Sequence, residues 1–546
     1  MSAATLAWDY LVLTASNAAQ AEAYETQLRL RRECGMLPQV REVLVVPDIG
    51  GKRIGSGGST LLCLVRIVER ERRRRGRTEG VTAILRELRI LIVHAGGDSR
   101  RLPAYGPCGK IFVPLPAPGP APVPAALFDR LVPGFLALPP GAPGRGQVVV
   151  VAGDALIRLD ASQVNFSKTG LTALGCYATP EEASRHGVFC FGPDGAVSLY
   201  LQKPSLAVQR AHGAIDAAGR TALDVAVMSL DAEAAECLLE AFGVAETAGA
   251  LDFSEEARRR LLSDGIDLYR EICCAMGSAA SLDHYLRSVR SSGSKWAEDA
   301  LTRVFPLVNR VPLHVELVPA CRFLHFGSTR QLIESGLAML AEEGRAAPFS
   351  TILVVNSSIA PPARVHGRDS WIEGCRIAAD VQLAGENVLV GVDVDAPLAL
   401  PEGACLEVLP GRDRAGGDVA FVRCYGVRDT FKHSVSENGL FCGRPLADWL
   451  RAAGMDADEV WPDVNDAAAH SLWNARVFPA QPSAADFTRW LWMYAPDSAT
   501  GSQLQTFREA DRYSAAEIAF FADQPAFHSR RLEIWKRSSL GLCDTP

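Results

Sequence analysis

The sequence predicts an α/β protein: a Rossmann-like domain with a mostly parallel sheet, then a parallel, left-handed β-helix, then a largely helical C-terminal segment. Two observations carry this prediction. Continuous apolar runs without alternation recur in the first half of the chain, as expected of strands that are covered on both faces. In the second half, apolar residues recur at a strict six-residue interval, which is typical of a β-helix.

Length and composition bound the organisation of the chain. At ~100–200 residues per domain, the 546 residues predict about three domains. We expect an α/β domain over 1–325, a β-helix over 326–425 and a C-terminal capping segment over 426–546. The formal charge of −7, from 56 basic and 63 acidic side chains, offers no field that attracts a polyanion, so no nucleic-acid partner is expected.

The cysteines and the N-terminus predict a cellular location. Fourteen cysteines occur without a C-x-x-C pair, which favours reduced thiols in a reducing compartment. The N-terminus lacks a basic region and has Asp9 where a signal peptide is apolar, and the chain has no run of ~18 apolar residues. We therefore expect a cytoplasmic protein that is neither exported nor inserted in a membrane. The sequence predicts no oligomeric state.

Three β-branched runs predict the buried strands of the first domain. They lie at residues 42–47, 88–94 and 147–153. Because none of them alternates apolar and polar residues, both faces of each strand should be covered. This favours a parallel sheet wrapped by helices.

The six-residue interval is carried by seven apolar residues. They are Leu353, Ile359, Val365, Trp371, Ile377, Leu383 and Leu389. In a β-helix, one such residue per short strand points into the prism. An amphipathic helix is the alternative, but Pro361 and Pro362 interrupt it. From about Gly426 the sequence is mixed, largely helical and rich in Trp, and we expect it to cap the open end of the β-helix.

The most informative motif follows the second buried run. Residues 92–110 read I-V-H-A-G-G-D-S-R-R-L-P-A-Y-G-P-C-G-K, a strand, a Gly-Gly turn and then basic residues. Ligands bind at the carboxyl ends of strands in open α/β sheets, and paired glycines let backbone N–H groups approach a phosphate. Arg101 and Lys110 are the expected cations that neutralise charge on a nucleoside triphosphate. The expected nucleotide contacts are Ala95, Gly96, Gly97, Ser99 and Arg100.

Two carboxylates are candidate ligands for Mg²⁺. Asp154 directly follows the third buried run, where it is placed to hold the ion against a triphosphate; the alternative is an N-cap of a following helix. Asp267 is the candidate second ligand. It lies four residues before Glu271, and an ordinary solvated acidic helix face is the alternative.

A second glycine-rich segment precedes a helical run. Residues 55–60 read G-S-G-G-S-T. Gly55, Ser56, Gly57 and Gly58 are candidates to cradle phosphates at the N-terminus of that helix. Alternatively, Thr60 caps the helix.

The loop at 92–110 resembles the A-G-G-x-G-x-R-L-x-P signature of the sugar nucleotidyltransferases. It departs from that signature at four places: Ser99 replaces the third glycine, Pro103 comes one place early, the lysine comes one residue sooner, and Gly109 precedes it in place of proline. These departures are shared with a narrower group. A G-S-G-G-x-T ahead of H-A-G-G-x-S-R-R-L-P-A-Y-G-P-x-G-K resembles the L-fucose-1-phosphate guanylyltransferases and the pyrophosphorylase half of the bifunctional fucokinase enzymes.

Four downstream segments extend this resemblance over nearly the whole chain. They lie at 325–328, 425–432, 472–479 and 513–531. The P-x-x-x-G-L-G-S-S loop of the kinase half occurs nowhere, so phosphorylation of the free sugar is not expected.

The resemblance implies a reaction and its substrates. The first domain would be a nucleotidyltransferase domain that converts GTP and β-L-fucose 1-phosphate to GDP-L-fucose and pyrophosphate, with Mg²⁺ as cofactor. Lys203 would contact the sugar phosphate, since 185–204 resembles the family's hairpin; an exposed hairpin lysine is the alternative. Asp224, which leads into an apolar run, is the candidate for a sugar hydroxyl, or it has only a structural role at a strand edge.

Three other functions stay open. The sugar substrate could be a related hexose 1-phosphate, because a few pocket side chains decide sugar choice. The β-helix could belong to a hexapeptide acyltransferase with His366 as base. The chain could also be a catalytically silent scaffold that binds a nucleotide sugar.

Overall fold

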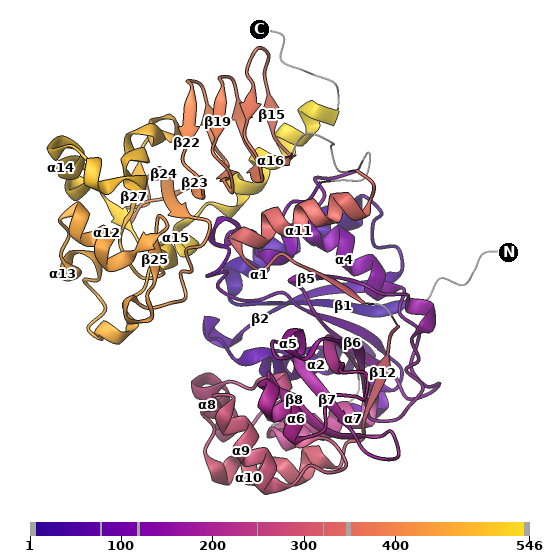
Figure 1. Cartoon of the computed structure of the whole chain (residues 1–546). Helices are drawn as coiled ribbons and strands as arrows, with labels where there is room; N and C mark the ends of the chain where they lie inside the picture. The colour runs from indigo at the N-terminus through magenta and orange to yellow at the C-terminus, as the bar shows by residue number, and fades with distance from the viewer. Residues whose placement is uncertain are drawn as a thin grey trace. The chain divides into compact units, whose positions relative to one another are not determined.

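The computed structural model describes residues 7–76, 79–116, 121–247, 249–319, 321–345 and 351–539. The chain groups into two compact units (Figure 1). The N-terminal unit comprises Met1–Gly97, Arg130–Gly153 and Ile157–Phe323, and the C-terminal unit comprises Asp98–Asp129, Asp154–Leu156 and Leu324–Pro546. The three-domain division stays a prediction. What it did not anticipate is that residues 98–129 belong with the second half of the chain.

A mixed sheet forms the centre of the N-terminal unit. Its main path runs β12-β6-β9-β4-β3-β1-β2, and β7 and β8 attach at β9. The strands are β1 (Trp8–Ala15), β2 (Val40–Pro47), β3 (Arg89–His94), β4 (Gln147–Ala152), β6 (Leu171–Ala178), β7 (Gly187–Phe191), β8 (Val197–Gln202), β9 (Thr221–Leu230) and β12 (Leu313–Leu317). The four strands β2-β1-β3-β4 are parallel, whereas β9 runs antiparallel to β4 and β6. The prediction of a mostly parallel sheet therefore fits only one half of this sheet.

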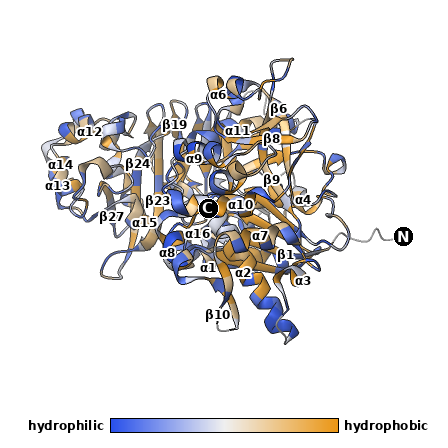
Figure 2. Ribbon diagram, turned by 90° about the horizontal axis from the view of Figure 1, so that it is seen from below, coloured by the Kyte–Doolittle hydropathy of each residue, from blue (hydrophilic) through white to orange (hydrophobic). Residues whose placement is uncertain are grey.

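The three predicted strands are confirmed as β2, β3 and β4. β3 and β4 are buried over nearly their whole length, but β2 is only partly buried because it lies at the edge of the sheet. The prediction missed β1, which lies between β2 and β3. Figure 2 colours the strands of this sheet mainly as hydrophobic, in agreement with their place in the core.

Helices surround this sheet. They are α1 (Ala18–Glu33), α2 (Gly55–Arg75), α3 (Val81–Leu85), α5 (Pro180–Ala183), α6 (Leu206–Ala211), α7 (Ala232–Ala241), α8 (Glu255–Asp264), α9 (Leu282–Ser291) and α10 (Glu298–Asn309). One core joins apolar residues of α2, α3, α7 and α10 to alternate residues of the strands, among them Tyr10 and Val12 of β1. A small hairpin of β10 (Val244–Thr247) and β11 (Ala250–Phe253) also belongs to this unit. No helix in the described ranges is both long and apolar enough to cross a membrane.

Three sets of parallel strands follow helix α11 (Thr329–Glu342) in the C-terminal unit, and the first set is part of a seven-stranded sheet that continues with the antiparallel strands described below. Their strands are β14 (Ile352–Val355), β17 (Ser370–Glu373), β20 (Val388–Val390) and β23 (Ala404–Arg412); β15 (Ser358–Ile359), β18 (Arg376–Ile377) and β21 (Asp393–Val394); and β16 (Val365–His366), β19 (Val381–Leu383) and β22 (Leu398–Leu400). Each strand from β14 to β20 pairs in parallel with the third strand after it, as in Ile352 with Ser370, Val365 with Val381 and Trp371 with Val388. The chain therefore coils through the three sheets in turn (Figure 1).

The seven residues of the six-residue interval lie on seven successive strands, β14 to β20. Their direction differs from the prediction at two positions. Leu353 and Trp371 contact helix α11 (Thr329–Glu342), since a Cβ built at Gly336 would lie 2.7 Å from Leu353 and 3.2 Å from Trp371. Leu389 pairs with Ile372, not with Trp371, and so lies on the opposite face of the sheet. The prediction that Leu353 and Trp371 point into the prism was therefore wrong. Coil length varies, and a shift of one residue along a strand turns the side chain to the opposite face of the sheet.

Antiparallel strands and helices complete the C-terminal unit. They are β24 (Asp418–Gly426), β25 (Leu440–Phe441), β26 (Arg444–Pro445), β27 (Phe478–Gln481), β28 (Arg512–Tyr513), α12 (Leu446–Ala453), α13 (Ala457–Val460), α14 (Gly501–Glu509), α15 (Ala515–Phe521) and α16 (Gln524–Ser539). The tryptophans Trp449, Trp490 and Trp492 pack around Phe507. α4 (Leu127–Leu136), β5 (Ala155–Arg158) and β13 (Arg322–His325) contain residues of both units.

Candidate functional site

The segment after β3 has little regular structure. We call residues 98–112 the cation loop; it contains only the 3₁₀ turns Pro103–Tyr105 and Lys110–Phe112. Ser99, which stands where the general signature has glycine, has a φ of 54°, a left-handed conformation that favours glycine. Gly109, in place of the proline before the lysine, has a φ of 68°. Both positions where the loop departs from the signature therefore have a left-handed backbone conformation.

Two cations and one carboxylate of the C-terminal unit converge beside this loop. The Lys110 Nζ lies 3.9 Å from the Asp154 Oδ2, and the Asp154 side chain is 42% exposed. A Cβ built at Gly327 would lie 3.5 Å from the Asp154 Oδ2 and 3.7 Å from the Arg101 Nη2, so both side chains point toward the same residue. Such a group can neutralise phosphate oxygens and bind a hard divalent cation.

The segment that leads into α11 holds the main chain of Asp154 and Arg101 by hydrogen bonds. The Phe326 N–H donates to the Asp154 carbonyl at 3.1 Å, and the Thr329 N–H donates to the Arg101 carbonyl at 2.9 Å. These residues lie in or next to the segment 325–328, which is one of the four segments that resemble the family. The alternative role of Asp154 as a helix N-cap was wrong, because strand β5 follows it.

Ser99 and Arg100 differ in what they offer a ligand. Ser99 is 4% exposed, and its buried hydroxyl has no hydrogen-bond partner among the described residues, which is unusual for a buried polar group. The Arg100 guanidinium already pairs with Asp98 at 3.0 Å and lies 5.2 Å from the centre of the Trp473 ring. Its role as a nucleotide contact stays a prediction.

The glycine pair belongs to the N-terminal unit and is held by β1 and α1. The N–H groups of Ala95 and Gly96 donate to the Thr14 Oγ1 at 3.1 and 3.3 Å, and the Tyr24 hydroxyl donates to the Ala95 carbonyl at 2.8 Å. Gly97, with a φ of 128°, has open space where a side chain would lie. Thr14 and Tyr24 were not predicted from the sequence; the W-D-Y-L-V-L-T-A run of β1 was the signal that could have identified them.

The second glycine-rich segment packs against another part of the chain. The N–H groups of Gly57 and Gly58 donate to the Ile266 carbonyl at 2.8 and 3.1 Å, so these two amides are already hydrogen bonded. A Cβ at Gly55 would lie 2.3 Å from the same carbonyl oxygen. Gly55, Gly57 and Gly58 thus allow close packing, and their hydrogen bonding gives no support to a phosphate role.

Ser56 and Thr60 complete this packing. The Ser56 Oγ accepts the Leu268 N–H at 2.9 Å. Thr60 lies inside α2, which begins at Gly55, so its assignment as the cap was wrong. Its hydroxyl donates to the Ser56 carbonyl at 2.9 Å and lies 2.9 Å from the His94 Nε2. Burial lowers the pKa of His94 to about 4, so its ring is neutral near pH 7. Because the Thr60 hydroxyl proton is used at Ser56, a hydrogen bond between Thr60 and His94 needs the tautomer protonated at Nε2.

The predicted hairpin is confirmed as β7 and β8, and Lys203 follows it. Its side chain is exposed, and its N–H donates to the His186 carbonyl at 3.0 Å. Its φ of 48° is a strained conformation for a lysine, which persists only where the surroundings hold it. Such strain occurs often at binding sites, and the sugar-phosphate contact stays a prediction.

Asp224 does not present its carboxylate to a ligand. It is 4% exposed; its Oδ2 accepts the Tyr200 hydroxyl at 2.8 Å, and its Oδ1 accepts the Ala226 N–H at 2.7 Å. Burial raises the pKa of this carboxyl to about 6. The predicted contact with a sugar hydroxyl therefore has no support, and because β9 is an internal strand, Asp224 is not at a strand edge either.

Asp267 caps a short π-helical turn (Leu268–Ile272). Its Oδ1 accepts the N–H groups of Tyr269 and Arg270, both at 3.0 Å. Glu271 is fully buried and accepts the Asp267 N–H at 2.7 Å, so the solvated acidic face was wrong. A metal role for Asp267 stays a prediction. Over the ranges that the structure describes, no three His, Cys, Asp or Glu side chains cluster as a metal site.

The fold and this geometry define a class: a mixed α/β protein in which the loop after a parallel strand brings two cations to one carboxylate. Comparisons with known proteins narrow the class. The model of the fucose pyrophosphorylase domain matches residues 82–483. The chain therefore belongs to the fucose pyrophosphorylase family.

Three relatives show how much of the chain the likeness covers. The bifunctional fucokinase/GDP-fucose pyrophosphorylase of Arabidopsis thaliana is 28% identical over 94% of this chain and 50% of its own length. The L-fucokinase/L-fucose-1-P guanylyltransferase of Bacteroides fragilis is 26% identical over 90% of this chain and 48% of its own. The fucose-1-phosphate guanylyltransferase of Mus musculus is 24% identical over 88% and 85%. The chain spans about half the length of the first two relatives.

Proposed function

We propose that this protein transfers a guanylyl group from GTP to β-L-fucose 1-phosphate, forming GDP-L-fucose and pyrophosphate. The observation that carries the proposal is the convergence of Arg101, Lys110 and Asp154 beside the cation loop. Its support from the comparisons is the family and the relative named for guanylyl transfer to fucose 1-phosphate, which this chain matches over most of both lengths.

The reaction needs positioned charge and no covalent protein intermediate. A phosphate oxygen of the sugar 1-phosphate forms a bond to the α-phosphorus of GTP, the bond from that phosphorus to the bridging oxygen breaks, and pyrophosphate leaves. Negative charge spreads over the phosphate oxygens in the transition state. Arg101 and Lys110 are placed to stabilise that charge, and Lys203 is the proposed contact of the sugar phosphate.

The structure also supports a place for magnesium. Mg²⁺ is usually bound by one or two carboxylates, with waters and substrate phosphates as its other ligands. Asp154, a partly exposed carboxylate beside Lys110, fits one such ligand. When bound, the ion would add positive charge at the triphosphate. The Oδ1 of Asp267 already accepts hydrogen bonds from two backbone N–H groups, so Asp267 is the weaker candidate.

Two finer features belong to the same proposal. The coil over residues 351–412 is a parallel β-helix, left-handed as in hexapeptide-repeat proteins, and a crystal structure would test its hand. The protein acts in the cytoplasm, a reducing compartment, since the cysteines over the described ranges are all free thiols.

Pyrophosphate release tests the proposal directly. The purified chain is incubated with each of four nucleoside triphosphates and a panel of hexose 1-phosphates, with Mg²⁺. We expect the fastest release from GTP with β-L-fucose 1-phosphate. Faster release with another pair corrects the substrates, and release with none overturns the proposal in favour of a silent scaffold. Consumption of acetyl-CoA would favour the acyltransferase; its candidate base His366 is exposed on β16.

A further inference from the structure

The cation loop is a series of short turns that contacts from outside orient. Arg101 and Lys110 lie on either side of one 3₁₀ turn, Pro103–Tyr105. Backbone hydrogen bonds between residues three apart run through the loop, among them those from the Leu102 N–H to Ser99 and from the Gly109 N–H to Gly106, but they join only near neighbours. The place of the turn within the unit, and with it the places of the two cations, therefore depends on what holds Pro103–Tyr105. The segments at 425–432, 472–479 and 513–531 resemble the family, yet nothing in the proposed chemistry uses them.

Tyr105 is the anchor of the turn. It is fully buried; its hydroxyl donates to the Glu373 Oε2 at 3.2 Å and accepts the Trp371 Nε1–H at 2.8 Å. Trp371 and Glu373 are two residues apart on β17, so they lie on the same face of the sheet. Both hydrogen-bonding capacities of the hydroxyl are used, which fixes the orientation of the ring.

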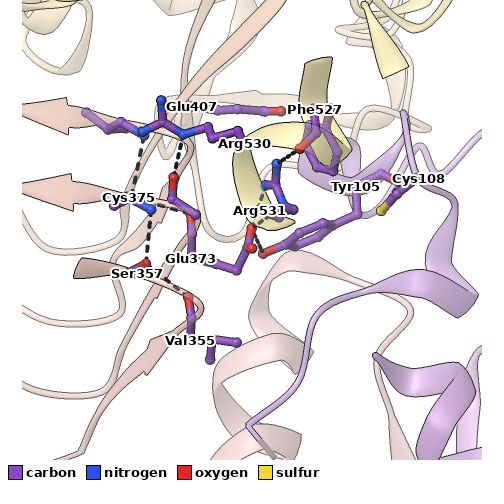
Figure 3. Close-up of polar contacts among 12 residues, drawn as sticks. Tyr105, Cys108, Val355, Ser357, Glu373, Cys375, Glu407, Phe527, Arg530 and Arg531 are labelled. Atoms are coloured by element: carbon purple, nitrogen blue, oxygen red, sulfur yellow. Dashed lines mark hydrogen bonds and ion pairs between the residues drawn. The ribbon is translucent and has the colours of Figure 1, made fainter. Parts of the chain in front are cut away.

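Glu373 is in turn held by the C-terminal helix. The Arg531 Nε and Nη2 donate to its Oε2 at 3.1 and 2.5 Å, and both side chains are almost completely buried. Arg531 is itself fixed, because its Nη1 donates to the Phe527 carbonyl at 2.9 Å and its guanidinium lies 3.3 Å from the centre of the Phe527 ring. Figure 3 shows Tyr105, Glu373 and Arg531 pointing toward one another.

A second buried ion pair holds the other end of the same turn. Arg423 and Glu407 form two hydrogen bonds, at 2.9 and 2.7 Å, with side chains 2% and 1% exposed. The Arg423 Nη2 also donates to the Pro103 carbonyl at 2.8 Å. Glu407 aligns with Glu373 through Val390 in the strand register, so both pairs lie on one face of the sheet.

Stability alone does not account for two buried ion pairs on one short turn. Burying charges is costly, and apolar residues of similar volume would stabilise the same packing equally well. What a charged, hydrogen-bonded pair adds is a defined geometry. The network thus ties α16, at the far end of the sequence, to the turn between the two candidate cations.

We infer that Arg531 and Glu373 are positioning residues, which act through Tyr105 to set the places of Arg101 and Lys110. The inference deepens the proposed function and rests on it for its activity readout. Both side chains are almost completely buried and so are not placed to bind a substrate directly; their effect should fall on the transition state, where a small misplacement of a charge is most costly.

Two conservative variants test the inference in the full-length chain. Tyr105→Phe removes only the hydroxyl, and Arg531→Lys keeps the charge but loses the fork that grips Glu373. We expect each to lower kcat roughly tenfold, with a smaller change in the KM for GTP. The matched control is Tyr513→Phe, which removes a buried tyrosine hydroxyl bonded to Asp511 at 2.8 Å; its kcat should stay close to that of the wild type.

Amide hydrogen exchange of residues 98–112 gives a second readout, independent of activity. We expect faster exchange in Tyr105→Phe and Arg531→Lys than in Tyr513→Phe. Unchanged exchange overturns the inference, and so does faster exchange with an unchanged kcat. If the wild type releases no pyrophosphate with any substrate pair, the proposed function fails, and exchange alone decides whether Arg531 holds the loop. If Arg531→Lys does not fold, Tyr105→Phe decides.

Discussion

Two glycine-rich segments look alike in the sequence and differ in the structure. At 55–58, the amides of Gly57 and Gly58 donate to the Ile266 carbonyl, and the glycines allow close backbone packing. In the segment that starts at Gly96, the Gly96 N–H also donates to the protein, at the Thr14 Oγ1, but Gly97 has open space beside it, the Ser99 hydroxyl has no partner among the described residues, and cationic side chains follow. The difference teaches that a glycine motif supports a phosphate site only where space beside it and cations near it are left for a ligand.

The largest expected effect is on activity, at the cation loop. Lys110→Ala and Asp154→Asn should each lower kcat by roughly 10³-fold, because each removes a charge that the transition state needs. The fold should survive, since both side chains are partly exposed. Pyrophosphate release measures kcat, and circular dichroism checks the fold. The matched control is Lys295→Ala, which changes an exposed lysine elsewhere. Activity near that of the wild type in Lys110→Ala would contradict the assignment of the cation loop as the phosphate site.

The next effect is on stability, at the other segment. Gly55→Ala should lower the free energy of unfolding by about 3 kcal/mol, through a left-handed φ and overpacking against Ile266. Gly76→Ala is the matched control: it also has a positive φ, but no atom of the described residues would lie within 4 Å of the added Cβ, so about 1 kcal/mol is expected. Urea unfolding measures both. A stable Gly55→Ala protein with a raised KM for GTP would restore a nucleotide role to this segment.

The pH dependence of stability tests whether Asp224 is structural. Its folded pKa of about 6 lies above the usual 3.8, so the protonated form is favoured in the folded protein. Its contribution is complete below pH 3.8 and is lost as the pH rises through 6. The free energy of unfolding of the wild type should fall by about 2 kcal/mol across that window relative to Asp224→Asn. Parallel curves for the two proteins would contradict the assigned pKa.

The smallest effect separates a helix cap from a metal ligand at Asp267. Asp267→Ala should lower the free energy of unfolding by about 1 kcal/mol, the value of an N-cap, while kcat and its dependence on Mg²⁺ stay close to those of the wild type. Thermal unfolding and a Mg²⁺ titration of pyrophosphate release measure the two quantities. A kcat that falls by orders of magnitude and recovers at high Mg²⁺ would instead confirm the metal assignment.

Local signals predicted much of the fold. Continuous β-branched runs identified β2, β3 and β4, because burial on both faces leaves that pattern in the sequence itself. The six-residue interval identified seven strands of the coil. β1 was missed although its apolar run is as clear as theirs, and with it Thr14 and Tyr24, which hold the glycine pair.

What the sequence by itself determined is the strands, the loop that carries Arg101 and Lys110, and membership of the family. Only the tertiary structure decided which donors remain available to a ligand, that Asp224 is buried and paired, that Trp371 faces Tyr105, and that residues 98–129 group with the C-terminal unit. The physical reason is the distance along the sequence between the residues that interact. Burial along one element leaves a local periodic pattern, whereas a hydrogen bond between residues hundreds of positions apart leaves none.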